Sequence, residues 1–394
     1  MHLALIIDDY LPHSTRVAAK MFHELALQLQ SMGHIVTVVT PNSNQSSAFK
    51  EDNIDGVTVW SFASGKIKDV NKLQRVFNET LLSFNGWRAI SSKVQASTFD
   101  GIVYYSPSIF FGSLVHKIKQ RCQCPAYLVL RDLFPQWIVD AGMIKSGSLV
   151  EKYFRYFEEL SYSQADMIGL MSEKNRDVFS VMVEKQYPTE ILRNWASLVP
   201  HSSQHSSLRK MLNLENKIIY FYGGNIGHAQ DMANLIRLAK SMQRHSQAHF
   251  LFVGQGDEVE LINRLAVEWE LKNFSYLPSV SQEQFKEILS EVDVGLFSLS
   301  PEHTAHNFPG KLLGYMVQSL PILGSVNQGN DLKDLINEYE AGYVSHNGDD
   351  ERLCDDAVAL LSDSARKARG HKGYQLLCKE FSVESIAKNI VDKF

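Results

Sequence analysis

The sequence predicts an α/β protein built from two doubly wound, Rossmann-like domains that face a cleft. Short apolar runs rich in Val, Ile, Leu and Tyr alternate with longer amphipathic stretches along most of the 394 residues. This alternation is typical of parallel sheets covered by helices on both faces. A polar segment interrupts it once, and a second strand–helix series follows. The length is sufficient for two domains with separate hydrophobic cores.

The first half begins with a predicted strand at 3–7 and a helix from about 15 to 32, in which apolar residues recur at helical spacing. Gly33 is expected to end this helix as a C-cap. The other strands predicted for this half lie at 35–40, 57–61, 102–105, 127–130, 167–170 and 190–192.

Residues 195–210, WASLVPHSSQHSSLRK, are rich in Ser and His and poor in core residues, which predicts a linker. We expect the two domains to be joined once, near 194–210. The second series has strands at IIYFYGG, HFLFVGQG, FSYLP, DVGLFSLS, PILGS and AGYVS. The predicted organisation is an N-terminal domain at 1–195, a C-terminal domain at 196–375 and a closing helix at 376–394.

Composition excludes several classes of protein. A formal net charge of −5 argues against a protein made to bind nucleic acid, because phosphate neutralisation needs surplus Lys and Arg. No apolar run approaches the roughly 20 residues of a membrane helix. The N-terminus reaches Asp8 and Asp9 after one short apolar stretch, so we expect no secretory signal. Four scattered cysteines predict free thiols in a reducing cytoplasm.

Two glycine-rich loops follow predicted strands of the second domain. The loop GGNIG at 223–227 precedes a helix, and its glycines let the backbone approach an anion such as a diphosphate. A tight turn without a ligand is the alternative interpretation. The spacing is not GxGxxG, so a nicotinamide enzyme is not favoured. The loop GQG at 254–256 is similar, and a simple turn is the favoured interpretation there.

The segment 298–323 carries the most chemical information. His303, His306 and Asn307 lie in a predicted loop before a helix start. Lys311, in the first turn of that helix, combines its charge with the free backbone amides of Leu312 and its neighbour, an arrangement suited to a phosphate. A salt-bridged surface lysine is the alternative. The two histidines have no third ligand nearby, so we expect no metal site.

These segments together resemble glycosyltransferases of the GT-B fold, family 4, over essentially the whole chain. The resemblance rests on DDYLPHSTRVAAKMFHELALQLQSMGHIVTVVTP, GGNIGHAQ, VGQGDEVE, YLPSVSQEQFKEILSEVDVGLFSL and FPGKLLGYMVQSLPIL, in the family's order and spacing. RDLFPQWIVDAG, GGNIGHAQDM, HNFPGKLLGYM and FSVESIAKNIV resemble bacterial O-antigen L-fucosamine transferases in particular.

The resemblance implies a reaction and a location. It implies transfer of an N-acetylated 6-deoxyhexosamine, such as N-acetyl-L-fucosamine, from a UDP-sugar to a lipid-linked, undecaprenyl diphosphate saccharide in O-antigen or lipopolysaccharide assembly. The expected mechanism retains the anomeric configuration by a front-face route, without cofactor or metal. The expected location is cytoplasmic and peripheral, on the inner face of the plasma membrane, with no nucleic-acid partner.

The resemblance also implies roles for individual residues. The first domain is expected to bind the acceptor, with Asp9 and Ser14 on that side, and the second to bind the nucleotide-sugar. The catalytic residues are expected to be Arg131, Asp132 and His306. The residues expected to bind the donor are Gly224, Asn225, Gly227, Gly254, Pro278, Val280, Glu302, Asn307, Lys311 and Leu312.

Several positions depart from the family pattern. The two acidic residues that the family carries eight apart align with His306 and Gly314, and Glu302 is the nearest acid. Asn225 stands at the position of the phosphate-loop arginine, and the loop lysine is missing as well. The diphosphate would therefore depend on Lys311 and on the backbone amides of Gly227 and Leu312.

A further departure lies on the acceptor side, where Arg131-Asp132 replaces the family's His-Asp pair. Arg131 cannot act as a base, because the pKa of arginine exceeds about 12. It could pair with a phosphate while Asp132 orients it or the incoming hydroxyl. The alternative is a structural ion pair at a strand end.

Residues 67–94 mix basic side chains with Phe84 and Trp87. Such a basic amphipathic stretch suits an anionic bilayer surface, and equally a helix packed on the sheet with solvated charges. Two other functions stay open. A UDP-sugar 2-epimerase of the same architecture would convert the nucleotide-sugar without an acceptor, and a non-catalytic nucleotide-sugar-binding protein would convert nothing.

Overall fold

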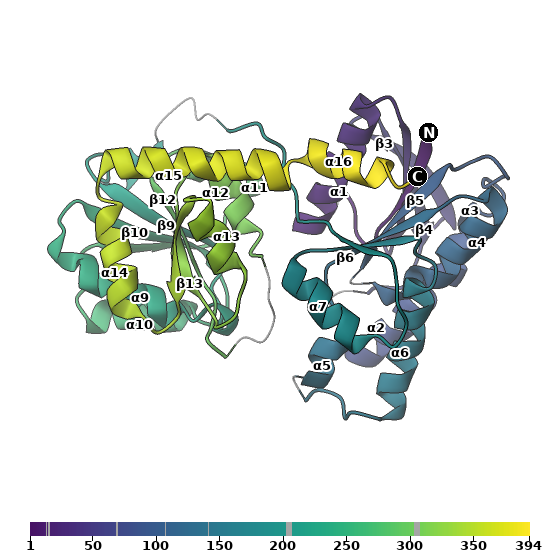
Figure 1. Ribbon diagram of the computed structural model, residues 1–394, viewed down its shortest axis with the longest axis horizontal. Helices are drawn as coiled ribbons and strands as arrows, with labels where there is room; N and C mark the ends of the chain where they lie inside the picture. Colours follow the sequence, from purple (N-terminus) through teal and green to yellow (C-terminus); the bar gives the residue numbers. More distant parts are fainter. Residues whose placement is uncertain are drawn as a thin grey trace. The chain divides into compact units, whose positions relative to one another are not determined.

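The computed structural model describes residues 1–12, 14, 16–67, 70–106, 108–140, 142–201, 207–302 and 308–394. It divides the chain into two compact units (Figure 1). Unit 1 consists of residues 1–193 together with 383–394, and unit 2 consists of residues 194–382. The chain therefore passes between the units twice, whereas the sequence predicted one connection.

Unit 1 contains an eight-stranded sheet in the order β3-β4-β2-β1-β5-β6-β7-β8. Each strand predicted for this half is present. The additional strand, β3, runs antiparallel to β4 at the sheet edge. Its sequence, FKEDNI, is mostly polar, so it was not predicted from apolar runs. The strands are β1 (His2–Ile6), β2 (Ile35–Asn42), β3 (Phe49–Ile54), β4 (Val57–Ala63), β5 (Gly101–Ser106), β6 (Ala126–Leu130), β7 (Met167–Leu170) and β8 (Thr189–Ile191).

The helices of unit 1 bury apolar faces against this sheet. Leu25 and Leu29 of α1 are fully buried, as the helical spacing in that segment predicted. All four cysteines are free thiols, also as predicted. The helices are α1 (Val17–Ser31), α2 (Lys72–Thr80), α3 (Leu82–Ile90), α4 (Gly112–Cys122), α5 (Gln136–Asp140), α6 (Leu149–Tyr162), α7 (Glu173–Met182) and α16 (Val383–Val391).

Unit 2 contains a six-stranded parallel sheet in the order β11-β10-β9-β12-β13-β14. The strands are β9 (Ile218–Asn225), β10 (Ala248–Gln255), β11 (Phe274–Leu277), β12 (Val294–Ser298), β13 (Ile322–Val326) and β14 (Gly342–His346). The helices are α8 (Ser207–Met211), α9 (Met232–Ser241), α10 (Val259–Glu268), α11 (Gln282–Leu289), α12 (Lys311–Val317), α13 (Leu332–Glu338), α14 (Asp350–Ala359) and α15 (Asp363–Leu376).

The strand order indicates where a ligand would bind in each unit. In unit 2 the order reverses between β9 and β12, and in unit 1 between β1 and β5. Open parallel sheets bind ligands in the crevice outside the carboxyl ends of the strands at this switch point. A ligand is therefore expected at the loops after β9 and β12 in unit 2, and at those after β1 and β5 in unit 1.

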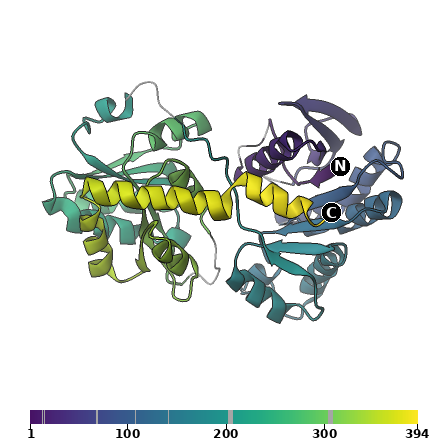
Figure 2. The same cartoon turned by 45° about the horizontal axis from the view of Figure 1, so that its top comes forward.

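The end of the chain returns to unit 1. Helix α15 ends at Leu376, and a π-helical turn at Leu377–Phe381 leads to an extended Ser382. Helix α16 then packs beside α1, where the yellow and purple helices adjoin in Figure 2. Its apolar face is buried, including Ile386 and Ile390. The closing helix was predicted at 376–394, but it begins at Val383 and belongs to unit 1. The sequence shows the apolar face of this helix but not which unit that face covers.

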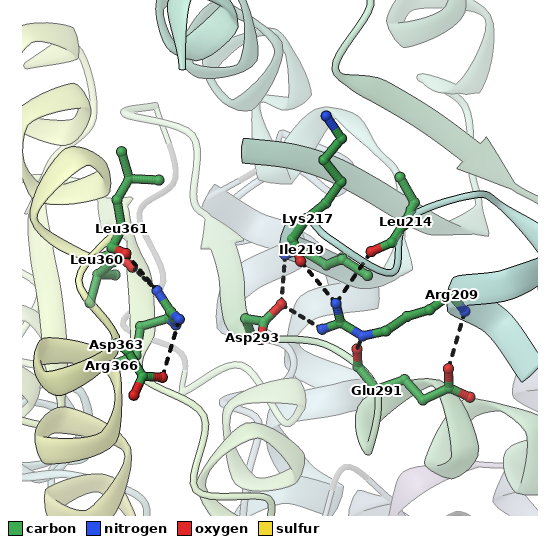
Figure 3. Close-up of polar contacts among 10 residues, drawn as sticks. All are labelled: Arg209, Leu214, Lys217, Ile219, Glu291, Asp293, Leu360, Leu361, Asp363 and Arg366. Atoms are coloured by element: carbon green, nitrogen blue, oxygen red, sulfur yellow. Dashed lines mark hydrogen bonds and ion pairs between the residues drawn. The ribbon is translucent and has the colours of Figure 1, made fainter. Parts of the chain in front are cut away.

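An arginine fixes the start of unit 2 (Figure 3). The Arg209 guanidinium donates to the carbonyl oxygens of Glu291 at 2.7 Å and Lys217 at 2.8 Å, and to the Asp293 carboxylate at 2.7 Å. The same carboxylate accepts the backbone amide of Ile219 at 2.8 Å. Charge-assisted hydrogen bonds therefore join the segment after the linker to the first residues of β9 and to the residues just before β12.

A second arginine plays a similar part between α14 and α15 in Figure 3. The Arg366 guanidinium donates to the carbonyl oxygens of Leu360 at 2.8 Å and Leu361 at 2.9 Å. Those carbonyls end α14, where helical partners run out, so the arginine satisfies them and holds the turn into α15.

We predict that Arg209→Ala lowers the free energy of unfolding by about 2–3 kcal/mol, because it leaves Asp293 and two carbonyl groups without their charged donor. The neighbouring Lys210 is exposed, and Lys210→Ala should change stability by no more than about 0.5 kcal/mol. Urea unfolding of the full chain measures both. Equal urea midpoints for the two variants would contradict the structural role of Arg209.

Candidate functional site

The loop after β9 is shaped by two paired glycines. Gly224 has a φ of +118°, a backbone conformation that residues other than glycine rarely adopt. Gly254 pairs with Gly224 across β9 and β10. A Cβ atom on Gly254 would lie 1.8 Å from the Gly224 carbonyl oxygen, so no larger residue fits there. The glycines thus keep the two strands close together and leave the Gly224 backbone exposed at the switch point.

Lys311 lies beside this exposed backbone. A Cβ atom on Gly224 would be 3.7 Å from Nζ of Lys311. Nζ also lies 3.5 Å from the centroid of the Tyr222 ring, a cation–π contact. The surrounding protein removes the amine from water and lowers the pKa of Lys311 well below that of an ordinary lysine. No acidic side chain pairs with it in the part of the chain that the structure describes.

In this arrangement the positive charge of Lys311 lacks a negative partner among the described residues. A cation that is withdrawn from water and lacks a counter-charge is costly, and an anion bound beside it would remove that cost. Gly224 and Asn225 supply the exposed part of the loop next to the amine. The geometry therefore suits a phosphate or diphosphate in contact with Lys311 and the Gly224 loop.

Tyr222 belongs to the site and was missed in the sequence. The residue is buried, and its hydroxyl donates to the carbonyl oxygen of Asn225. Tyr315 of α12 contacts the same strand, since its hydroxyl accepts the backbone amide of Gly223 at 3.4 Å, and it also lies 3.0 Å from the carbonyl oxygen of Leu296 in β12. Alternation along a strand places Tyr222 on the same face as Gly224, and this signal could have identified it.

Asn225 and Gly227 lie together in the loop after β9. The Asn225 side-chain amide donates to Oε1 of Gln230 at 2.8 Å. A Cβ atom on Gly227 would lie 2.6 Å from that amide and 2.8 Å from Oδ1 of Asp257. Asn225 therefore fixes the loop's own conformation, and Asp257 is an acidic neighbour that the sequence did not single out.

The loop after β12 reaches the same place. The amide of Ser300 donates to the carbonyl oxygen of Ala229 at 2.9 Å, and the amide of Glu302 donates to Oγ of Ser300 at 3.3 Å. Glu302 is exposed next to this contact. His303, His306 and Asn307 lie outside the described residues, so the structure places none of them.

The first turn of α12 corrects one prediction. The amide of Leu312 donates to the carbonyl oxygen of Pro309 at 3.0 Å, and the amide of Leu313 donates to that of Gly310 at 3.3 Å. The Leu312 side chain is buried in the core. These amides are not free for a phosphate, because the turn closes on itself. The positive contribution of this turn is thus the Lys311 side chain.

Pro278 and Val280 follow β11, beside the loop after β10. Pro278 is exposed, whereas Val280 packs partly against the core. Ser279 between them donates to Oε1 of Gln255 at 3.1 Å. The loops after β9, β10 and β11 are therefore linked at the carboxyl edge of the sheet.

In unit 1, Arg131 holds backbone. Its guanidinium is buried and donates to the carbonyl oxygens of Leu192 at 2.7 Å and Arg193 at 3.1 Å. Burial lowers the pKa of Arg131 to about 10, and the neighbouring Tyr105, Tyr127 and Asp132 oppose that shift. These contacts secure the end of β8, which favours a structural role over the predicted contact with a phosphate.

Asp132 is the more accessible member of the pair, since it is exposed after β6. Partial removal from water raises the pKa of its carboxyl group, and Arg131 opposes that shift. Its position at a carboxyl strand end suits an acceptor hydroxyl.

Asp9 and Ser14 are brought together after β1. Oγ of Ser14 donates to Oδ2 of Asp9 at 2.5 Å and accepts the amide of Arg16 at 3.2 Å. Nε of Arg16 lies 3.9 Å from the same Asp9 oxygen. The two residues predicted on the acceptor side thus form one polar cluster at the switch point of unit 1.

Two searches of the described residues bear on other chemistry. They contain no group of three His, Cys, Asp or Glu side chains placed to hold a metal ion. Within the same ranges, no helix has the length and apolar character required to cross a membrane.

Comparison with known protein families identifies the second unit. Residues 204–376 match the profile described as glycosyl transferases group 1. In this region the chain is therefore similar to group 1 glycosyltransferases. The matched region contains the glycine loop, Lys311 and the loops around them.

Curated relatives agree with this assignment. WbjE of Pseudomonas aeruginosa, classed with the glycosyltransferases, is 26% identical over 225 residues, which are 55% of this chain and 54% of WbjE. The match thus spans about half of that relative. WcaI of Escherichia coli K12, named for glycosyl transfer in colanic acid biosynthesis, is 23% identical over 309 residues, 73% of this chain and 74% of WcaI.

A solved structure extends the likeness to the whole fold. HepE of Anabaena, crystallised in complex with UDP, has a TM-score of 0.68 and 14% identity, and the match covers 100% of this chain and 99% of HepE. The predicted GT-B fold is confirmed, and the matches to glycosyl transferases group 1 and to WbjE and WcaI support the predicted class of enzyme.

We predict that Lys311→Met separates stability from ligand binding. Methionine has a similar length without the charge, so the variant should melt at the same or a higher temperature than the unmodified protein when no ligand is present. UDP should raise the melting temperature of the unmodified protein and leave that of the variant unchanged. Thermal melting with and without UDP measures both effects.

Lys286 is a suitable control, because it is exposed on α11 of the same unit. Lys286→Met should keep the response to UDP. If Lys311→Met also kept the full response, the diphosphate would bind elsewhere.

Proposed function

We propose that this chain is a UDP-sugar-dependent, retaining glycosyltransferase. The observation that carries the proposal is the Lys311 amine, withdrawn from water beside the exposed Gly224 backbone at the switch point of the glycosyltransferase domain. A leaving diphosphate supplies the negative charge that this amine lacks in the described structure. The crystallised HepE complex supports UDP as the nucleotide, since the two chains share a fold.

The donor residues divide by function. Lys311 and the loop containing Gly224, Asn225 and Gly227 hold the diphosphate. The loops after β10 and β11, with Gly254, Pro278 and Val280, hold the nucleoside. Glu302, from the loop that contacts Ala229 through Ser300, lies on the side where the donor sugar would extend.

The proposed reaction breaks one bond and forms another on the same face of the sugar. The bond from the anomeric carbon to the β-phosphate oxygen of UDP breaks, and the acceptor oxygen bonds to that carbon. The departing phosphate oxygen takes the proton from the acceptor hydroxyl. Lys311 stabilises the charge that develops on the diphosphate, so catalysis is electrostatic and positional.

Asp132 and the Asp9–Ser14 cluster serve the acceptor. Each lies at a carboxyl strand end of unit 1, where a polar substrate would bind. We propose that Asp132 orients the attacking hydroxyl and that Asp9 and Ser14 hold the rest of the acceptor. Arg131 acts on the reaction indirectly, by fixing the backbone that follows β8. His306 keeps its proposed catalytic role and Asn307 its proposed role in donor binding.

The proposed donor sugar is an N-acetylated 6-deoxyhexosamine such as N-acetyl-L-fucosamine. The proposed acceptor is an undecaprenyl diphosphate saccharide used in O-antigen or related surface polysaccharides. The name of WcaI, which refers to colanic acid biosynthesis, supports a polysaccharide product. We further propose that the enzyme needs no metal or other cofactor and works at the inner face of the plasma membrane.

A transfer assay tests the proposal. The full chain is incubated with UDP-sugars, including UDP-N-acetyl-L-fucosamine, and with undecaprenyl diphosphate N-acetylglucosamine, and UDP release and labelled product are measured. We expect UDP release only when donor and acceptor are both present, no effect of EDTA, and a product with retained configuration. Conversion of a UDP-sugar without acceptor would indicate an epimerase instead, and binding without conversion a non-catalytic protein.

Asp132→Asn provides the residue-level arm of the same assay. We expect it to lower kcat by at least about tenfold, because the carboxylate that orients the hydroxyl is lost. Asp140→Asn is the matched control, since Asp140 is an exposed carboxylate of the adjacent α5. Equal activity in the two variants would remove Asp132 from the mechanism.

A further inference from the structure

Helix α2 has an apolar side that covers nothing in unit 1. No residue of this nine-residue helix is buried. Leu73 and Phe77, four residues apart and hence on one face, are 85% and 64% exposed. Lys72 and Arg75 are also exposed. A helix this short gains little stability from propensity alone, so an unpaired apolar face indicates an external partner.

A second group of exposed apolar side chains lies beside α2. Leu149 and Val150 begin α6, with Leu149 83% exposed, and Trp137 and Met143 precede them. The hydroxyl groups of Thr80 and Tyr153 share a hydrogen bond, which joins α2 to α6. Figure 1 shows α2, α5 and α6 gathered at one end of unit 1. We call this surface the apolar patch: Leu73, Phe77, Trp137, Met143, Leu149 and Val150.

The patch is held rigidly from below. The Phe134 ring packs against Trp137 and Phe154, with ring centroids 6.3 Å and 4.9 Å away. The Arg155 guanidinium donates to the side-chain oxygen of Gln136, which joins α6 to α5. The exposed apolar residues thus project from a packed aromatic base.

The neighbouring helix α3 shares this exposure at Phe84, which is 58% exposed, but not at Trp87. Trp87, which the sequence offered as a membrane anchor, packs against the core. The Arg121 guanidinium lies 4.4 Å and the Lys117 amine 5.8 Å from its ring centroid. Within residues 67–94, the exposed apolar residues are therefore Leu73 and Phe77 of α2 and Phe84 of α3, whereas Trp87 is engaged.

We infer that the apolar patch docks on a bilayer surface that carries anionic lipids. Lys145 and Lys152 are exposed among the apolar residues, and Lys72 adjoins Leu73. Lysines at this position extend to anionic headgroups while aromatic and aliphatic side chains enter the interface between headgroups and acyl chains. The patch combines these features on helices that are joined by the Thr80–Tyr153 and Arg155–Gln136 hydrogen bonds.

The charges disfavour a second copy of the chain as the occupant. A two-fold interface places the same patch on both sides, so Lys72, Lys145 and Lys152 of both copies would be enclosed in one contact area. Lysine is depleted from the centres of protein interfaces, because its charge is costly to remove from water. An anionic bilayer satisfies the same lysines.

The location of the patch agrees with a lipid-linked acceptor, and in this respect the inference rests on the proposed function. Trp137 follows Asp132 by five residues, so the patch begins where the proposed acceptor side ends. Docking through the patch would bring the acceptor-side loops of unit 1 to the membrane surface, where the diphosphate head of a polyprenyl acceptor lies.

Vesicle co-sedimentation of the full chain tests the inference. The vesicles are phosphatidylcholine alone or phosphatidylcholine with phosphatidylglycerol. We expect binding chiefly to the anionic vesicles. A triple variant, Phe77→Ser, Met143→Ser and Leu149→Ser, should bind at least about tenfold more weakly, and a Lys145→Glu, Lys152→Glu variant should lose the preference for anionic lipid.

Controls come from unit 2. Val267→Ser with Met211→Ser changes exposed apolar residues, and Lys210→Glu with Lys272→Glu changes exposed lysines; both should bind vesicles normally. Binding by the triple variant equal to that of the unmodified chain would overturn the inference. So would a dimer that the triple variant dissociates, because the patch would then be a contact between copies.

UDP melting shifts on the same proteins separate this inference from the proposed function. Every patch variant should keep its UDP response, which also shows that it is folded. Loss of vesicle binding with the UDP response intact assigns the patch alone. A chain that binds vesicles through the patch without responding to UDP would refute the proposed donor and leave the docking surface standing.

Discussion

The site depends on a lysine amine held out of water without a counter-charge in the described structure. Lys311 is placed between the Tyr222 ring and the Gly224 backbone, and desolvation lowers its pKa. The attraction to the aromatic ring compensates only part of the cost of desolvation. A phosphate of the substrate would supply the rest. The desolvation cost of the Lys311 amine in the unliganded protein is thus relieved when a diphosphate binds, which favours binding. The same contact stabilises the diphosphate as it leaves.

The sheets place this lysine. In unit 2 the parallel order reverses beside β9, which leaves a crevice at the carboxyl ends of the strands. Gly254 lets β10 approach β9, and a Cβ atom on Gly224 would lie 3.7 Å from the Lys311 amine. Arg209 ties the first segment of unit 2 to the residues just before β12, on the other side of the same switch point. The structural contacts and the chemical site therefore share one framework.

Much of this could be predicted from the sequence. Buried parallel strands read as apolar runs, and the glycine loop with Lys311 could be recognised because unusual backbone and charge requirements restrict residue choice. The edge strand β3 was not predicted, because its exposed sequence is polar. The return of α16 to unit 1 was not predicted either, because an apolar face identifies a helix but not the surface that the helix covers.

The chemistry of single groups was harder to predict. Leu312 was expected to offer a free amide, but local turn geometry engages it with Pro309. Arg131 was expected near a phosphate, but it donates to carbonyl oxygens some 60 residues away in sequence, at 2.7 Å and 3.1 Å. Hydrogen bonds of this kind depend on tertiary packing, which residue types and spacing do not specify.

The charge of Lys311 can be measured by a pH titration of ¹³C-labelled lysine side chains by NMR, with Lys311→Met to assign the resonance. The account predicts that Lys311 in the free protein loses its proton at a lower pH than the exposed lysines. Bound UDP favours the charged form and should raise that pKa. A Lys311 resonance that titrates with the exposed lysines and does not respond to UDP would contradict the account.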